Sequence, residues 1–165
     1  MVEAGILDEG ERIELIRGVL SPMGSEGSIH ARARWLLTRV FTLALGPEWF
    51  VGSDASLFLA DDTEVQPDLH VFPSRLPSAD VRGPDVLLAI ELSNTTQYRD
   101  LKVKTPIYAE HGVRELWVID LDAKTGLIFD KIENGAYAPG RAVSADDVLT
   151  PKLISGVSLR ISDLY

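Results

Sequence analysis

One stretch, "DVLLAIEL" at residues 85–92, constrains the fold of this chain more than any other. It contains the longest apolar run, Val86–Ile90, and a run without polar alternation is typical of a strand covered on both faces. The run therefore predicts the central strand of a buried sheet. It is followed directly by a carboxylate, Glu91, and an unpaired charge is costly to bury. Glu91 is therefore the first candidate for a functional residue.

The patterns before this strand predict several strands and one helix. Two short strands are expected around Gly18, in "RIELIRGVLSPM". A helix with a serine cap is expected over residues 25–46, and three arginines, Arg32, Arg34 and Arg39, lie on its polar face. Its apolar face is expected to consist of Ala31, Trp35, Leu36, Val40 and Leu43. Two strands within 49–60 and one over 65–72 complete this half.

The patterns after the central strand predict a second helix and further strands. Residues 97–111 are expected to be helical in part, and residues 112–122 to form a strand. Residues 124–137 are expected to form a hairpin that turns at 124–126, and the tail to be irregular except for a short strand near 157–161. This order predicts a mixed α/β (α+β) fold with one central sheet, in a single domain over residues 1–165.

Composition limits the classes of protein that this chain can belong to. It contains no cysteine, which excludes a disulfide scaffold and a thiolate zinc site and fits a cytoplasmic location. No apolar stretch approaches the roughly 20 residues that span a bilayer, and the start shows no signal-peptide pattern, so no membrane association is expected. The net charge of −9 counts against a dedicated nucleic-acid binder, although an acidic protein can carry a local basic strip.

Two acids are expected at the ends of neighbouring strands. Asp68 follows Pro67 at a strand edge, and Glu91 ends the central strand. If they face a common point, their oxygens suit Mg²⁺, which can polarise a phosphate and activate water. The simpler alternative is that an acid at a strand end is solvated. From its alternating pattern alone, Glu14 is expected to point to water.

A second polar group follows Glu91 in the chain. Asp100, Lys104 and Tyr108 are spaced i, i+4, i+8, which places them on one face of a helix. The ordinary alternative is a solvated face with one ion pair. Pro106 predicts a kink or a new helix start at Thr105. The stripe favours Lys104, rather than Lys102, as the lysine that points toward the sheet.

Several familiar sites are missing from the sequence. The histidines, His30, His70 and His111, show no metal-binding spacing, and no GxSxG nucleophile elbow is present. The chain also lacks a P-loop and a GxGxxG motif. Kinase, NTPase and dinucleotide-binding functions are therefore not supported.

The ordered motifs resemble those of one known family. They are "ELIRG", "VQPDL", "IELSNTT", "RDLKVKTPIYAEHGVRELWVID" and "GLIFDKIENGAY". Each is weak alone, but together their order and spacing resemble the Uma-type putative restriction endonuclease family of the PD-(D/E)-x-K nuclease-like superfamily, over nearly the whole chain. The resemblance implies a restriction-endonuclease-like mixed sheet flanked by helices. It also implies a Mg²⁺-dependent nuclease, for which Mn²⁺ can substitute, and a homodimer.

The resemblance also implies roles for individual residues. Asp68 and Glu91 correspond to the two metal-binding acids, and Glu14 to the acid from the early element. Lys104 corresponds to a lysine that has moved from the strand to the following helix, because Ser93 occupies the usual lysine position. The implied supporting residues are Asp100 and Tyr108. Two other departures are Leu116, in place of an aromatic residue, and a loop at 93–95 that lacks a proline.

Two functions of different classes follow. The first is hydrolysis of phosphodiester bonds in nucleic acid, with DNA favoured. In it Asp68 and Glu91, with the Leu92 carbonyl, bind Mg²⁺, Glu14 completes a second site or holds a water, and Lys104 orients water or stabilises the phosphate. The residues expected to contact phosphates are Arg32, Arg34, Arg39, Arg99 and Lys102. The second is a non-catalytic dimeric interaction or regulatory module with a vestigial acid cluster, which the net charge of −9 favours.

Overall fold

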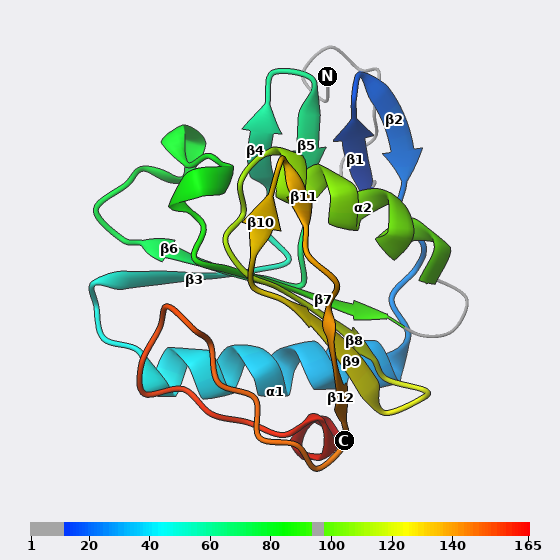
Figure 1. Ribbon diagram of the computed structural model, residues 1–165, viewed down its shortest axis with the longest axis vertical. Coiled ribbons are helices and arrows are strands. Elements are labelled where there is room, and N and C mark those ends of the chain that lie inside the picture. Colours follow the sequence, from blue (N-terminus) through cyan, green and yellow to red (C-terminus); the bar gives the residue numbers. More distant parts are fainter. Residues whose placement is uncertain (1–11, 94–97) are drawn as a thin grey trace.

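A six-stranded mixed sheet forms the middle of the protein (Figure 1). The computed structural model describes residues 12–93 and 98–165, and for residues 98–101 it describes the backbone alone. The strands follow the order β12-β9-β8-β7-β6-β3. Their bounds are β3 Trp49–Ser53, β6 Leu69–Pro73, β7 Leu88–Ser93, β8 Leu116–Asp120, β9 Thr125–Phe129 and β12 Arg141–Ser144. Among the described pairs of this sheet only β7 and β8 are parallel, and helix α2 connects them.

Strand β7 is the central strand that the apolar run predicts. All six of its residues are buried, and β6 and β8 pair with its two edges. Leu88, Ile90 and Leu92 belong to the core cluster on the side of helix α1, whereas Ala89 belongs to the cluster on the side of helix α2. Because side chains alternate along a strand, Glu91 projects toward α2.

The early strands form a second sheet instead of joining the central one. Its order is β2-β1-β5-β4, and its strands are β1 Ile13–Ile16, β2 Val19–Pro22, β4 Leu57–Ala60 and β5 Thr63–Val65. The strand expected over residues 65–72 is therefore two strands, β5 and β6, in different sheets. The break falls at Pro67, which has no N–H to donate to a ladder. Asp68 thus lies where the chain crosses between the sheets.

Helix α1, Ser28–Ala44, packs on one face of the central sheet (Figure 1). Its buried residues are Ala33, Leu37 and Phe41, which recur every four residues. The predicted apolar face is therefore wrong in part, since Trp35 and Leu43 are 59% and 75% exposed. The predicted serine cap is also wrong, because the N-cap is Gly27 and makes no side-chain hydrogen bond.

Helix α2, Tyr98–Glu110, packs on the opposite face and continues through Pro106. The new start expected at Thr105 is therefore not observed. Proline removes a single helical hydrogen bond, and the residues directly after it, Ile107 and Tyr108, are buried against the sheet and hold the last turn in place. Among the described residues, no helix is long and apolar enough to cross a bilayer.

The remaining corrections concern the C-terminal third. Gly126 lies inside β9, and the hairpin turns before it, where Lys124 has a φ of 56°. A side chain at Gly126 would come within 3.1 Å of the Val118 carbonyl oxygen, so close packing of strands explains this glycine. A second small hairpin pairs β10 Ile132–Glu133 with β11 Ala136–Tyr137. The tail, expected to be irregular, supplies the edge strand β12, whereas residues 157–161 form no strand beyond a bridge at Leu159.

Candidate active site

Asp68 and Glu91 come together through the pairing of β6 with β7. Leu69 pairs with Ile90 in antiparallel register, so the next position outward places Asp68 opposite Glu91. Residues opposite each other in antiparallel strands share a face of the sheet. The two acids are 7% and 4% exposed. The structure thus brings together the two acids that the sequence places at neighbouring strand ends.

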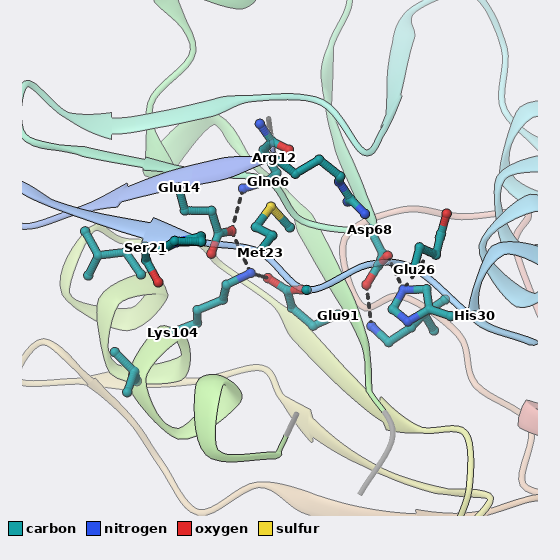
Figure 2. A pocket seen from close by; sticks show the side chains of 15 residues that line it. Arg12, Glu14, Ser21, Met23, Glu26, His30, Gln66, Asp68, Glu91 and Lys104 are labelled. Carbon is teal, nitrogen blue, oxygen red and sulfur yellow. Dashed lines mark hydrogen bonds and ion pairs between the residues drawn. The ribbon is translucent and has the colours of Figure 1, made fainter. Parts of the chain in front are cut away.

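Glu91 is held by a group that we call the lysine cluster: Glu14, Glu91, Lys104 and Tyr108. The Lys104 Nζ atom lies 2.7 Å from Glu14 Oε1 and 3.1 Å from Glu91 Oε1. The Tyr108 hydroxyl donates a 2.6 Å hydrogen bond to the same Glu91 oxygen. The cluster joins β1, β7 and α2, and therefore ties the second sheet to the central one (Figure 2).

The orientation of Glu14 follows from a backbone contact. The backbone N–H of Gln66, just before the crossing point between the sheets, donates a 2.8 Å hydrogen bond to Glu14 Oε1. Glu14 is 4% exposed, so the expectation from its local pattern that it points to water is wrong. Lys104 is 7% exposed and points inward, whereas Lys102 is exposed on the same helix.

Burial dominates the electrostatics of the lysine cluster. Burial is the largest cause that raises the pKa of Glu91 to about 7, and the charges of Asp68 and Glu14 act in the same direction against the pull of Lys104. Burial alone would lower the pKa of Lys104, but the charges of Glu91 and Glu14 outweigh burial and raise it. Burial, with the charge of Glu91, also raises the pKa of Tyr108 well above its usual value. Tyr108 therefore remains a hydrogen-bond donor.

Asp68 is held by a different group, which we call the histidine cluster: Glu26, His30, Arg34 and Asp68. The Leu92 backbone N–H donates a 2.8 Å hydrogen bond to Asp68 Oδ2. The other oxygen, Oδ1, lies 2.6 Å from His30 Nε2. Burial alone would lower the pKa of His30, but its hydrogen bond to Asp68 and the negative charge of Asp68 raise it.

Arg34 and Glu26 complete the histidine cluster. Two hydrogen bonds of 2.8 Å join the Arg34 guanidinium to both oxygens of Glu26. Glu26 Oε1 is 4.0 Å from His30 Nε2. One ligand atom each from Glu26, His30 and Asp68 lies within 4.8 Å of the others, and no other such group of three was found among the described residues.

All members of the two clusters except Tyr108 and Arg34 line one cleft of about 180 Å³ between the second sheet, α1 and α2 (Figure 2). A water molecule occupies roughly 30 Å³ of liquid, so the cleft can hold a cation with several waters. Arg12 also lines the cleft and pairs with Asp54. Its Nε atom is buried and has no hydrogen-bond partner among the described residues. The cleft therefore combines carboxylates with an unsatisfied cationic donor.

The remaining residues that the sequence predicts for the site lie away from the cleft, or their side chains are not described by the structure. Arg32 and Arg39 are exposed on α1, and the Arg39 guanidinium lies 5.6 Å from the centre of the Trp35 ring. The side chains of Arg99 and Asp100 lie outside the described residues.

Sequence reasoning missed three residues of the cleft: Arg12, Glu26 and His30. A usable signal for two of them is that Glu26 and His30, two metal-ligand types, lie four residues apart where the helix begins, with Glu26 just before the N-cap Gly27. Arg12 belongs to no motif, so no pattern in the sequence identifies it as a residue of the cleft.

Comparison with known proteins identifies the family of this chain. The family model Uma2, described as putative restriction endonuclease, matches residues 3–162. The chain belongs to the Uma2 family. Membership confirms the resemblance of the sequence motifs and supports a nuclease that acts on nucleic acid. No curated protein matches the chain.

A solved structure shares the fold of this Uma2 protein. It is a putative nuclease belonging to DUF820 from Anabaena variabilis, with a TM-score of 0.78 and 17% sequence identity. The match covers 98% of this chain and 94% of that chain. At this identity the likeness concerns the fold, and it confirms the predicted mixed α/β class with a nuclease-type sheet.

Proposed function

We propose that this protein is a metal-dependent nuclease that hydrolyses phosphodiester bonds of nucleic acid, with DNA as the favoured substrate. The observation that carries the proposal is the meeting of Asp68 and Glu91 in one cleft, with Lys104 bound to Glu91. Family membership supports the same activity. The catalytic cleft would then use residues from β1, β7 and α2, together with the crossing point at Asp68.

The donor atoms fit a divalent cation such as Mg²⁺ or Mn²⁺. Glu14, Asp68 and Glu91 are buried carboxylates that line one cleft, and the charge of Asp68 helps raise the pKa of Glu91. Such repulsion between carboxylates is what a bound cation relieves. Asp68 and Glu91 would hold the ion, with Glu14 beside them. When bound, the ion would polarise the phosphate and lower the pKa of water.

Lys104 and Tyr108 have distinct roles in this proposal. The Lys104 ammonium, which lines the cleft, would stabilise negative charge that develops on the phosphate. Its pairs with Glu14 and Glu91 hold the flexible side chain in one position, so little reorganisation is needed during the reaction. Tyr108 is completely buried and touches Glu91, so it acts as a positioning residue.

Arg12 supplies a contact for the substrate on the other side of the cleft. The Arg12 side chain lines the cleft, where its positive charge would attract a phosphate group. Arg32, Arg39 and Lys102 are exposed cations that could contact the nucleic-acid backbone farther from the cleft.

The proposal extends to the organisation of the protein. We propose one domain over residues 1–165, acting as a homodimer in the cytoplasm. The family resemblance supports the dimer, and the lack of cysteine suits a reducing compartment. Sedimentation of the purified protein at several concentrations tests the dimer, which a single species with the mass of one chain would exclude.

The decisive experiment compares cleavage by matched variants. Purified wild-type protein with Mn²⁺ or Mg²⁺ is incubated with supercoiled plasmid and with single-stranded DNA, beside Glu91→Ala and Glu110→Ala. Glu110 is an exposed acid on α2 that pairs with Arg17, so its loss should leave cleavage unchanged. We expect cleavage by the wild type and Glu110→Ala, and none by Glu91→Ala.

Equal cleavage by wild type and Glu91→Ala would contradict the proposal and indicate a contaminating nuclease. A complete lack of cleavage, together with no Mn²⁺ binding at millimolar concentration in calorimetry, would favour the alternative of a non-catalytic dimeric module. Binding of Mn²⁺ that Asp68→Asn abolishes would favour the enzyme.

A further inference from the structure

We propose that His30 is a metal ligand of this cleft, and that its nitrogen makes the site prefer Mn²⁺ over Mg²⁺. The inference rests on the proposed function, because it concerns the same metal ion. His30 lies on α1, and it belongs neither to the motifs that the sequence shares with the family nor to the pair of acids Asp68 and Glu91.

The geometry of His30 and Asp68 carries the first step. His30 Nε2 and Asp68 Oδ1 are 2.6 Å apart, so the two atoms already converge on one point. The second oxygen of Asp68 accepts the Leu92 N–H, which fixes the direction of the carboxylate. A cation that enters between them would replace the contact between His30 and Asp68 with two metal–ligand contacts.

A second observation comes from the other side of the cleft. Glu91 is 4% exposed, and Lys104 and Tyr108 both bind its Oε1 atom. In Figure 2 the other carboxylate oxygen of Glu91 points toward Asp68 and His30. A buried carboxylate from β7 thus points into the cleft from the side of the lysine cluster, outside the group formed by Glu26, His30 and Asp68, whose ligand atoms lie within 4.8 Å of one another.

Glu26 is a weaker ligand than His30. Both of its oxygens accept hydrogen bonds from Arg34, and its Oε1 atom is 4.0 Å from His30 Nε2. The Arg34 guanidinium is bound by Glu26 at 2.8 Å and lies 4.0 Å from Asp68. We therefore assign His30 and Asp68 as the ligands that already converge, with Glu91 as the carboxylate that a bound cation would draw toward them and Glu26 behind them.

Ligand chemistry gives the selectivity. Mg²⁺ prefers oxygen ligands and strict octahedral geometry, and it gives up its waters reluctantly. Imidazole nitrogen suits transition-metal ions, whose affinity for such sites rises from Mn²⁺ along the first row. A site with one imidazole and two carboxylates should therefore bind Mn²⁺ more tightly than Mg²⁺, and removal of the imidazole should narrow that difference.

The test measures metal ligation directly. Full-length wild type, His30→Gln and His111→Gln are loaded with MnCl₂, and electron spin-echo modulation reports whether ¹⁴N is bound to the ion. His111, at the end of α2, is the matched control because it does not line the cleft. Calorimetry gives the dissociation constants for MnCl₂ and MgCl₂.

We expect ¹⁴N modulation in the wild type and in His111→Gln, and none in His30→Gln. The Mn²⁺ dissociation constant should rise about tenfold or more in His30→Gln, and that for Mg²⁺ about threefold or less. Saturable Mn²⁺ binding without ¹⁴N modulation in the wild type would overturn the inference and leave the proposed nuclease intact. Absence of both Mn²⁺ binding and Glu91-dependent cleavage would overturn the proposed function itself.

Discussion

The lysine cluster and the histidine cluster lie in one cleft, yet they differ in how their charges are balanced. In the lysine cluster, Lys104 binds two carboxylates and Tyr108 donates to one of them. In the histidine cluster, Arg34 is engaged by Glu26, and Asp68 faces the imidazole of His30. The first cluster has an internal cation for its acids, whereas the second leaves a carboxylate oxygen and a nitrogen pointing at each other.

The lysine cluster therefore contributes to the stability of the fold, whereas the histidine cluster contributes mainly to ligand binding. The lysine cluster connects β1, β7 and α2, so it holds the two sheets together as well as positioning Lys104. The histidine cluster connects the start of α1 to the crossing point at Asp68 and can open around a cation. Substitutions in the first should therefore affect both stability and cleavage, and those in the second mainly metal binding.

Lys104→Met is expected to have the largest effect. It leaves Glu14 and Glu91 buried without their ammonium, which should lower the free energy of unfolding by about 3 kcal/mol. Loss of a preorganised cation should also reduce kcat by on the order of 10²–10³-fold. Urea unfolding and single-turnover cleavage measure the two effects.

Two variants control for Lys104→Met. Lys102→Met, on the exposed side of the same helix, should raise KM with little change in kcat or stability. His30→Gln should cost less stability than Lys104→Met, because the glutamine amide can still donate a hydrogen bond to Asp68. Equal destabilisation by His30→Gln and Lys104→Met would contradict the proposed division between the clusters.

The next largest effect is the pH dependence of metal binding. Because burial and neighbouring acids raise the pKa of Glu91 to about 7, a proton competes with the metal below that pH. Mn²⁺ affinity should fall by up to about tenfold per pH unit as pH falls below 7. Calorimetry between pH 5.5 and 8.5 measures this, and an affinity independent of pH would contradict it.

The stability of the metal-free protein should change with pH in the opposite direction. A carboxyl group with a raised pKa binds its proton more tightly in the folded state. Its contribution to stability is complete below pH 4.5 and is lost as pH rises through about 7. Urea unfolding of the wild type and Glu91→Gln should show this loss in the wild type alone, and saturating Mn²⁺ should reverse it.

Much of this arrangement could be predicted from local patterns. The apolar run specifies β7, and helical spacing places Lys104 and Tyr108 on the side that faces the sheet, because both depend on near neighbours in the chain. The sequence also predicts that Asp68 and Glu91 lie on neighbouring strands, although β7 continues past Glu91 to Ser93.

Other features depend on contacts between distant segments. Nothing in the apolar spacing of α1 distinguishes the stripe through Leu37, which is buried, from the stripe through Trp35, which is exposed. The choice depends on the surface that the sheet presents. In the same way, His30 meets Asp68 across 38 positions of sequence, and only the packing of α1 under the sheet brings them together.

Tyr108→Phe should have a moderate effect confined to the lysine cluster. It removes the 2.6 Å hydrogen bond to Glu91, and a bond to a charged group contributes about 1.5–3 kcal/mol. Since this bond also stabilises the ionised carboxylate, the pKa of Glu91 should rise and the midpoint of Mn²⁺ binding should move to higher pH. An unchanged midpoint would show that Tyr108 does not act on Glu91.

Glu26→Gln should have the smallest effect. Arg34 already occupies both oxygens of Glu26, so Glu26→Gln should weaken Mn²⁺ binding by no more than about tenfold, the low end for residues behind the metal ligands. Asp68→Asn provides the comparison, because Asp68 lies opposite Glu91 and should be required for binding. If Glu26→Gln abolished binding as completely as Asp68→Asn, Glu26 would be a main ligand and the roles within the histidine cluster would be reversed.

The most direct test of the account is a crystal structure of the protein soaked with Mn²⁺, with anomalous scattering used to locate the ion. We predict an anomalous peak between Asp68 and Glu91, bound by both carboxylates and by His30 Nε2, with Lys104 still in contact with Glu91. A fully soaked crystal without a peak in the cleft, or with Mn²⁺ bound only elsewhere on the surface, would contradict the central claim that these acids form a metal-dependent nuclease site.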